Sequence, residues 1–340
     1  MNKKFLVIQT AFPGDAILTL PFIQKLNESN PFSIIDVVCI PATAEIFSAS
    51  PFVNKVIILN KRKEHKSLLS IIKFSLKIKN ENYSKVYSPH RSFRSSLIVF
   101  LSSIKESYGY DVASMSFIYK NKIKYEKSFH EVQRILQFLG DKKQIKNWNI
   151  LPEINVSEES VKKIDDYLKQ FRNNKIAAVA PGSVWNTKIY PEKYYCELIK
   201  FLRSKDFEVV LLGGKSDRAI CGNILNNFEQ GVISAAGEFS IVESIEILKN
   251  CELLICNDSA PTHMAMCADI PVVTIYCSTV PAFGFFPYNK KSITVSYDDL
   301  DCKPCGIHGH NKCPINTFDC GNKLLPEKII DKIEEIISSK

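Results

Sequence analysis

The sequence lacks the features that mark membrane-spanning and exported proteins. Its 340 residues contain no run approaching the roughly 18 uncharged apolar residues that a membrane-spanning helix needs. The apolar stretch near the start, Phe5–Ile8, is too short for the hydrophobic core of a secretory signal. We therefore expect a soluble, cytosolic protein.

Glycine-rich nucleotide fingerprints are missing as well. Residues 10–15, Thr-Ala-Phe-Pro-Gly-Asp, follow the first expected strand without the glycine spacing of a dinucleotide-binding turn. Residues 213–217, Gly-Gly-Lys-Ser-Asp, lack the spacing of a P-loop. Nicotinamide, flavin and P-loop chemistry are thus poorly supported, and no recognised nucleic-acid-binding module is present.

Positive charge is concentrated in the first half of the chain. The net charge is +8, and residues 61–127 alone carry fifteen Lys or Arg against five Asp or Glu. An anionic lipid surface or a phosphorylated acceptor would explain such a basic surface. The alternative is a solvated lysine-rich face without a partner.

Strand and helix signals alternate along the chain, which predicts a parallel α/β fold. The length favours two domains, and the alternation restarts near residue 155. Residues 104–128 are expected to form loops and edge strands, and 141–154 a connector. Expected strands are 5–9, 34–40, 56–59, 85–88, 176–180, 208–212 and 253–256. Expected helices are 15–26, 43–47, 66–79, 93–102, 129–139, 157–171, 191–205, 216–226, 241–249 and 325–338.

Polar turns follow three of the expected strands. In an open parallel sheet, ligands bind where strand ends meet helix starts, because unpaired N–H groups and the helix dipole favour anions there. Asp258 and Ser259 follow the strand 253–256 and could equally cap the next helix. Asp15 has the same two interpretations, a helix cap or a carboxylate that takes a proton from a hydroxyl nucleophile. Lys188 lies in a loop after the strand 176–180, where a lysine suits a phosphate.

Four motifs in chain order resemble those of the ADP-heptose:lipopolysaccharide heptosyltransferases, glycosyltransferase family 9. They are Gly14–Pro21, Pro181–Ser183 with Lys188, Gly213-Gly214 with Asp217, and Asn257–Ser259 with His263. The resemblance covers nearly the whole chain and is greatest to the second inner-core heptosyltransferases. It implies a GT-B fold, in which two Rossmann-like domains face each other across a cleft. Residues 1–155 would bind the acceptor, and 156–340 the nucleotide sugar.

The resemblance also implies an inverting transfer of heptose from ADP-heptose to the lipopolysaccharide inner core. Asp15 would be the base and Lys188 would stabilise the leaving diphosphate, without a catalytic metal. The acceptor would contact Arg91 and Arg94, at the inner face of the cytoplasmic membrane. Expected nucleotide-sugar contacts are Ser183, Thr187, Lys188, Gly213, Gly214, Asp217, Phe239, Asp258, Ser259, Ala260 and His263. A protein acceptor and a non-catalytic binding scaffold remain alternatives.

Four of the eleven cysteines are clustered in the loop 302–320. Cys302, Cys305, Cys313 and Cys320 have a spacing that suits a tetrahedral zinc or iron site. Such a site would be structural, because four thiolates leave no open position for a substrate. Reduced surface thiols and adventitious disulfides are the other interpretations.

Overall fold

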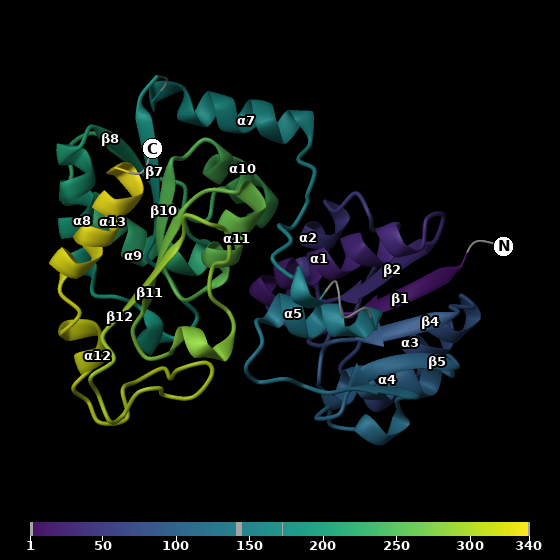
Figure 1. Ribbon diagram of the computed structural model, residues 1–340. Helices are drawn as coiled ribbons and strands as arrows, with labels where there is room; N and C mark the ends of the chain where they lie inside the picture. Colours follow the sequence, from purple (N-terminus) through teal and green to yellow (C-terminus); the bar gives the residue numbers. More distant parts are fainter. Residues whose placement is uncertain (1–2, 141–144, 172, 339–340) are drawn as a thin grey trace. The chain divides into compact units, whose positions relative to one another are not determined.

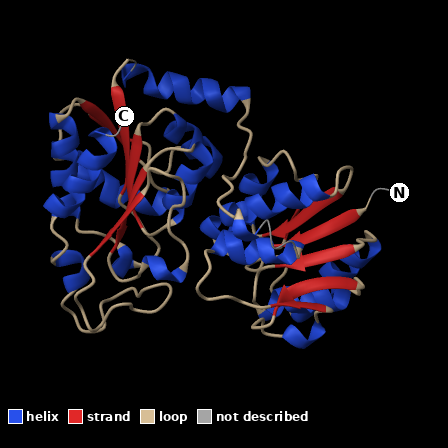
Figure 2. Ribbon diagram, viewed as in Figure 1, coloured by secondary structure: helices blue, strands red, loops and turns tan. Residues whose placement is uncertain are grey.

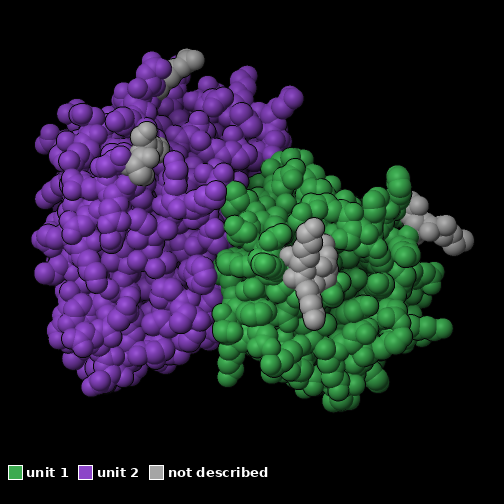
Figure 3. All heavy atoms as spheres, viewed as in Figure 1, with its two compact units in different colours: residues 1–155 green, residues 156–340 purple. Residues whose placement is uncertain are grey.

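The chain divides into two compact units, residues 1–155 and 156–340 (Figure 3). The computed structural model describes residues 3–140, 145–171 and 173–338. Part of the connector predicted at 141–154, residues 141–144, therefore lies outside the described residues. Each unit is described by itself below.

The first unit is a six-stranded, fully parallel sheet in the order β3-β2-β1-β4-β5-β6. Figure 1 shows β2, β1, β4 and β5 side by side in this order. Its strands are β1 (Lys4–Ile8), β2 (Ile34–Cys39), β3 (Lys55–Ile58), β4 (Lys85–Ser88), β5 (Glu106–Tyr110) and β6 (Asn121–Ile123). Its helices are α1 (Pro13–Ser29), α2 (Ala44–Ser48), α3 (Leu68–Asn80), α4 (Phe93–Ser102) and α5 (Glu131–Leu136).

The second unit repeats this architecture in the order β12-β11-β10-β7-β8-β9, again fully parallel. Its strands are β7 (Lys175–Ala180), β8 (Phe207–Leu211), β9 (Val232–Ser234), β10 (Leu253–Asn257), β11 (Val272–Tyr276) and β12 (Ile293–Ser296). Its helices are α7 (Glu158–Leu168), α8 (Glu192–Ser204), α9 (Arg218–Leu225), α10 (Ile241–Lys249), α11 (Ala260–Ala268), α12 (Asp319–Asn322) and α13 (Pro326–Ser338). Figure 2 shows helices on both faces of each sheet, so the predicted parallel α/β class is confirmed.

Both sheets reverse their winding direction once. The chain leaves β1 for β2 and β3 on one side, then returns to pair β4 with β1 on the other. The second unit does the same at β7 and β10, where Leu253 pairs with Ala177. Loops at such a reversal diverge to opposite sides of the sheet and leave a crevice at the carboxyl ends of the strands. The loops after β1, β4, β7 and β10 are therefore the natural place for a site.

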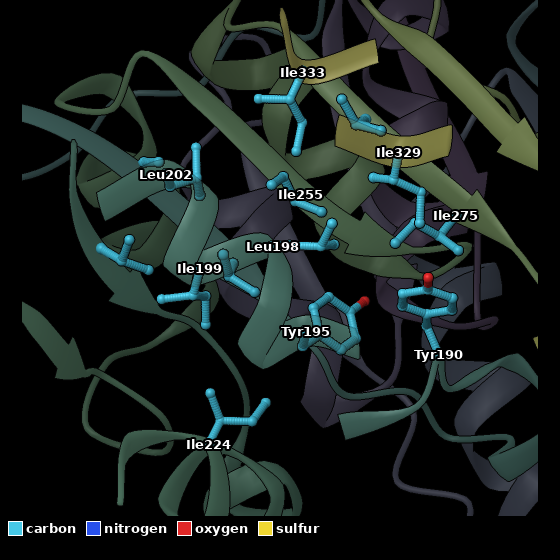
Figure 4. Packing of buried hydrophobic residues seen from close by; sticks show 14 of the residues in the cluster. Tyr190, Tyr195, Leu198, Ile199, Leu202, Ile224, Ile255, Ile275, Ile329 and Ile333 are labelled. Carbon is cyan, nitrogen blue, oxygen red and sulfur yellow. The ribbon is translucent and has the colours of Figure 1, made fainter. Parts of the chain in front are cut away.

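A dense apolar core fixes the second sheet in position. Leu198, Ile199 and Leu202 on α8 pack with Ile255 of β10, and all four side chains are fully buried or nearly so (Figure 4). The spacing of the three α8 residues places them on one helix face, because residues three and four apart lie on the same side. Ser240 begins α10 with a capping box, since its hydroxyl accepts from the Glu243 amide.

The observed elements differ from the expected ones mainly at the sheet edges. Strands β9, β11 and β12 were not among the expected strands, whereas the strands expected within 104–128 are present as β5 and β6. The predicted helices at 129–139 and 157–171 each end in a turn of 3-10 helix, Gln137–Leu139 and Lys169–Phe171. Edge strands bury only part of one face, so their hydrophobic pattern is short and weak.

Candidate functional site

A polar cluster of the second unit lies where β7 and β10 end. Asn257, the last residue of β10, is fully buried and joins this turn to the loop 181–190 that follows β7. Its amide nitrogen donates to Pro181 O at 2.7 Å, while its Oδ1 accepts from the Tyr190 amide at 3.0 Å and the Tyr195 hydroxyl at 2.9 Å. One side chain thus fixes two loops that are distant in sequence.

A buried ion pair lies at the centre of the cluster. Lys188 Nζ is 2.7 Å from Asp258 Oδ2, and the two side chains are 12% and 10% exposed. The amine also donates to Asp258 O at 3.1 Å, and the Thr279 hydroxyl donates to Asp258 Oδ2 at 2.6 Å. The structure therefore brings the predicted Lys188 and Asp258 into direct contact, and the carboxylate holds the amine in one place.

Helix α11 begins directly beside this pair. Ser259 is its N-cap and Pro261 lies in its first turn, as the sequence predicts. The predicted side-chain cap is wrong, however, since the Ser259 hydroxyl instead donates to Asn257 O at 3.3 Å. Ala260 opens the helix, and the first-turn amides keep the partial positive charge that attracts anions.

His263 lies one turn into α11 and is only 5% exposed. Burial lowers the pKa of its imidazole to about 4, so the ring is neutral at physiological pH. Within the described residues its Nδ1 atom is buried without a hydrogen-bond partner. Buried polar atoms without a partner are rare in folded proteins, and Nδ1 of His263 is one of the few among the described side chains.

Asp217 has a local structural role. Its Oδ2 accepts from the Gly214 amide at 2.8 Å, which fixes the turn after β8. A Cβ on Gly182 would lie 2.4 Å from the Asp217 carboxyl, and one on Gly213 would lie 2.7 Å from its Cβ. Glycine at both positions therefore allows the backbone to lie close to the Asp217 side chain. The carboxylate holds the Gly213-Gly214 turn beside the 181–190 loop.

The remaining predicted residues of this unit have different surroundings. Ser183 is half-buried, and its hydroxyl accepts from the Trp185 amide at 3.4 Å. Thr187 is buried and bonded to Ser278 at 3.0 Å. Phe239 packs edge-on against Tyr167 of α7, with ring centroids 4.8 Å apart.

The polar cluster of the first unit is built around Asp15. This residue is the third of α1, and its Oδ2 accepts from the Phe12 amide at 3.2 Å, so it does help to cap the helix. Burial and the nearby Glu131 carboxylate raise the pKa of Asp15 from 3.8 to about 7. A carboxylate with a pKa near neutrality is well suited to general base catalysis.

Sequence reasoning missed Glu131 and its partner Arg134. Both are buried on α5, with Arg134 Nη1 2.9 Å from Glu131 Oε2. Arg134 also donates to Lys127 O at 2.6 Å, and its guanidinium lies 4.9 Å from the Tyr125 ring centroid. In the sequence, a buried Glu–Arg pair three residues apart has the same pattern as an exposed one. The sequence therefore gives no indication that this pair is buried.

Basic side chains surround the loops after β3 and β4. Lys61 Nζ donates to Thr10 O at 2.8 Å, and burial together with Arg94 lowers the pKa of Lys61 to about 8. Arg91 stacks over Tyr125, its guanidinium 4.3 Å from the ring centroid. His90, also missed, lies 2.8 Å from Thr10 Oγ1, and burial beside Lys61 and Arg91 lowers its pKa to about 4. This edge of the unit therefore suits an anionic ligand.

The predicted metal centre is not supported. The four cysteines line one pocket of about 280 Å³. Across the described parts of the chain, however, no group of three or more His, Cys, Asp or Glu side chains is placed to hold a metal ion. Their burial differs, since Cys302 faces solvent while Cys320 packs into the core of the second unit.

Comparisons with known proteins agree on one family. A model described as glycosyltransferase family 9 (heptosyltransferase) matches residues 71–313. Lipooligosaccharide heptosyltransferase 2 of Campylobacter jejuni is 24% identical over 95% of this chain and 96% of that protein.

Solved structures are similar over the whole chain. The structure of E. coli ADP-heptose LPS heptosyltransferase II covers 99% of both chains with a TM-score of 0.81 at 20% identity. A family 9 glycosyltransferase from Veillonella parvula covers 100% of this chain and 99% of that one, with a TM-score of 0.87 at 19% identity. These likenesses confirm the predicted fold class.

Proposed function

The chain belongs to glycosyltransferase family 9, and on that premise we propose that it transfers heptose from ADP-L-glycero-D-manno-heptose to the inner core of lipopolysaccharide. The observation that carries this proposal is the buried Lys188–Asp258 pair at the start of α11. An amine held beside helix-terminal amides suits the diphosphate of a nucleotide sugar. Relatives named heptosyltransferase 2 point to heptose as the sugar.

In this proposal the second unit holds the donor. Lys188 and the first-turn amides of α11 would bind the diphosphate and stabilise the negative charge that develops as it leaves. His263, neutral and with an unpaired Nδ1 among the described residues, would bind a donor hydroxyl. These groups are held before the ligand arrives, which is what makes electrostatic stabilisation effective.

The first unit would hold the acceptor and supply the base. Asp15 would take the proton of the acceptor hydroxyl as that oxygen attacks the anomeric carbon, and the bond from this carbon to the diphosphate breaks on the opposite side. The anomeric configuration is inverted in such a single displacement. Lys61, Arg91 and Arg94 would bind the phosphates or carboxylates of the inner core.

The donor and the acceptor can be tested together. Purified protein is incubated with labelled ADP-heptose and either a Kdo-bearing lipid acceptor or an outer-membrane protein. Label on the lipid supports the proposal, whereas label on protein alone would replace the acceptor assignment. A panel of ADP-, GDP- and UDP-sugars in thermal shift tests the nucleotide, because a ligand at 100 times its Kd stabilises by about 2.7 kcal/mol. Absence of both turnover and an ADP shift would overturn the proposal.

We further propose that the first unit associates with the surface of an anionic membrane. No helix in the described ranges is long and apolar enough to cross a bilayer. Helices α3 and α4 pack together, and each presents exposed apolar side chains, Leu69 and Leu76 on α3, Phe93 and Phe100 on α4. Lysines flank these side chains along α3. Apolar residues ringed by basic ones are typical of surfaces that bind the headgroup region of anionic lipids.

A pocket of about 410 Å³ on the same unit joins this apolar face to the basic loops. It is lined by Lys61, Lys66, Leu68, Ile71, Ser92, Phe93, Arg94 and Leu97. Its mixture of aliphatic and cationic side chains suits an amphiphilic anion better than a free sugar.

Vesicle sedimentation tests the membrane proposal. Wild type should pellet with phosphatidylglycerol-containing vesicles, should not pellet with pure phosphatidylcholine, and should be released by salt. Leu69→Asp should weaken pelleting about tenfold or more, whereas Leu325→Asp, at an exposed leucine of the second unit, should not. Equal pelleting of both variants would contradict the proposed surface.

A further inference from the structure

The loop 302–318 is bonded to the loop that carries Lys188. The Thr187 amide donates to His310 O at 3.0 Å, and the His310 amide donates to Thr187 Oγ1 at 2.8 Å. The Thr187 hydroxyl in turn donates to Ser278 Oγ at 3.0 Å, and Thr187 is only 4% exposed. We call this pair of bonds between Thr187 and His310 the loop clasp.

Gly309 makes the clasp possible. It is buried, with φ of +77°, and a Cβ there would lie 2.8 Å from both Thr187 Oγ1 and Ser278 Oγ. Those two hydroxyls are bonded to each other, so neither can move away without breaking that bond. The same Cβ would lie 3.5 Å from Lys188 Cγ. The backbone of Gly309 thus packs directly against the residues around the ion pair.

Gly306 in the same loop provides a contrast. It also has a positive φ, +71°, but a Cβ there would meet nothing within 4 Å. Both glycines satisfy the same backbone requirement. Only Gly309 has the additional need for close packing against Thr187.

The loop 302–318 is held firmly enough to act as a support. The Cys305 amide donates to Ser278 O at 2.8 Å. The Lys303 amine, whose side chain is 2% exposed, donates to Tyr276 O and Tyr297 O, both at 3.0 Å. These bonds fix the start of the loop to the end of β11 and to the residues that follow it. The middle of the loop, at Gly309 and His310, can therefore hold Thr187 in one position.

We propose that Gly309 and His310 are positioning residues that, through Thr187, hold Lys188 where it binds the diphosphate of the donor. The inference rests on the proposed function, which makes a nucleoside diphosphate the ligand of Lys188. Lys188 follows Thr187 directly, so a displaced Thr187 shifts the lysine backbone. A misplacement of about 1 Å can reduce the rate by as much as 10²-fold.

Two matched variants test the clasp. Gly309→Ala should raise the KM for the nucleotide sugar and the Kd for ADP by about 10-fold or more, and leave the acceptor KM within about twofold. Gly306→Ala has the same backbone cost and should leave the Kd for ADP within about twofold of wild type. A purely structural role would lower Tm in both variants without this selective loss of donor affinity.

A third variant and a second measurement keep the test independent of folding and of turnover. Thr187→Val keeps the side-chain shape, removes the hydroxyl and should reproduce the rise in Kd for ADP. Hydrogen exchange at the Thr187 amide, measured without any ligand, should be faster in Gly309→Ala than in Gly306→Ala. Equal ADP affinity and equal exchange in the two glycine variants would overturn the inference. Failure of the proposed function appears instead in wild type, as absence of ADP-heptose turnover.

Discussion

Asp15 combines a structural contact with the raised pKa that its proposed role as the base requires. Its carboxylate accepts from the Phe12 amide, which stabilises the first turn of α1. Burial and Glu131 nevertheless make the charged form costly and raise the pKa to about 7. The carboxyl is therefore about half ionised near pH 7, and its ionised form can accept a proton.

Replacing Asp15 by Asn tests its proposed role as the base. Asp15→Asn should lower the transfer rate by roughly 10²- to 10⁴-fold, the usual contribution of a general base. In wild type the rate should rise with pH to a plateau, with a midpoint near 7. A flat profile between pH 5 and 8 and an active Asn variant would contradict the assignment.

The folding stability should fall as pH rises, in the direction opposite to the transfer rate. Because the folded-state pKa of Asp15 lies above its ordinary value of 3.8, the folded state binds the proton more tightly, and this stability is lost as pH rises through about 7. Asp15→Asn should therefore raise Tm at pH 8 and have less effect at pH 4. Asp165→Asn, at an exposed position of α7, is the control and should change Tm little at either pH.

Asn257 is the residue on which the second polar cluster depends. Asn257→Ala should lower the free energy of unfolding by about 3 kcal/mol, because Pro181 O, the Tyr190 amide and the Tyr195 hydroxyl lose a buried partner. Asn186→Ala, at an exposed position of the same loop, should cost less than about 0.5 kcal/mol. Urea denaturation measures both values. Equal losses would show that the buried amide is not the link between the two loops.

At the scale of secondary-structure elements, the turn after β8 is stable only if the loop after β7 can pack closely against it. Gly182→Ala should lower Tm by several degrees, because its Cβ would overlap the Asp217 carboxyl that holds Gly214. Gly214→Ala places a Cβ 3.7 Å from Asp217 Oδ2, an ordinary contact, and should change Tm much less. Calorimetry of the two variants tests this ordering, and a reversed order would contradict it.

The sequence predicted the elements that carry a strong local pattern. The loops at Asp15, Lys188 and Asp258 were found because each follows a buried strand, and the change from apolar to polar residues is local. The side-chain hydrogen bonds of Asn257 and the proximity of Glu131 to Asp15 could not be found this way, since they depend on contacts between segments distant in sequence. The cysteine spacing predicted a metal site, and the described residues show no group of side chains placed to hold one.

At the scale of the whole molecule, each unit has its own sheet and its own apolar core. We expect two calorimetric transitions, since separate cores can unfold separately. ADP should raise the Tm of only one of them, because its proposed contacts lie entirely in the second unit. Lys188→Met should abolish that shift. A single transition, or a shift of both, would contradict this independence.

The reversed winding of each sheet has a consequence for how the protein is synthesised. Strand β7 leaves the ribosome long before β10, its neighbour in the sheet, and in the interval it can pair only with β8. Asn257 is the last residue of β10, so the cluster cannot form until β10 has been made and has paired with β7. Pairings across such long chain separations are the slow ones in folding. A nascent chain would therefore acquire this polar turn late, after β7, β8 and β9 of the same sheet have been made.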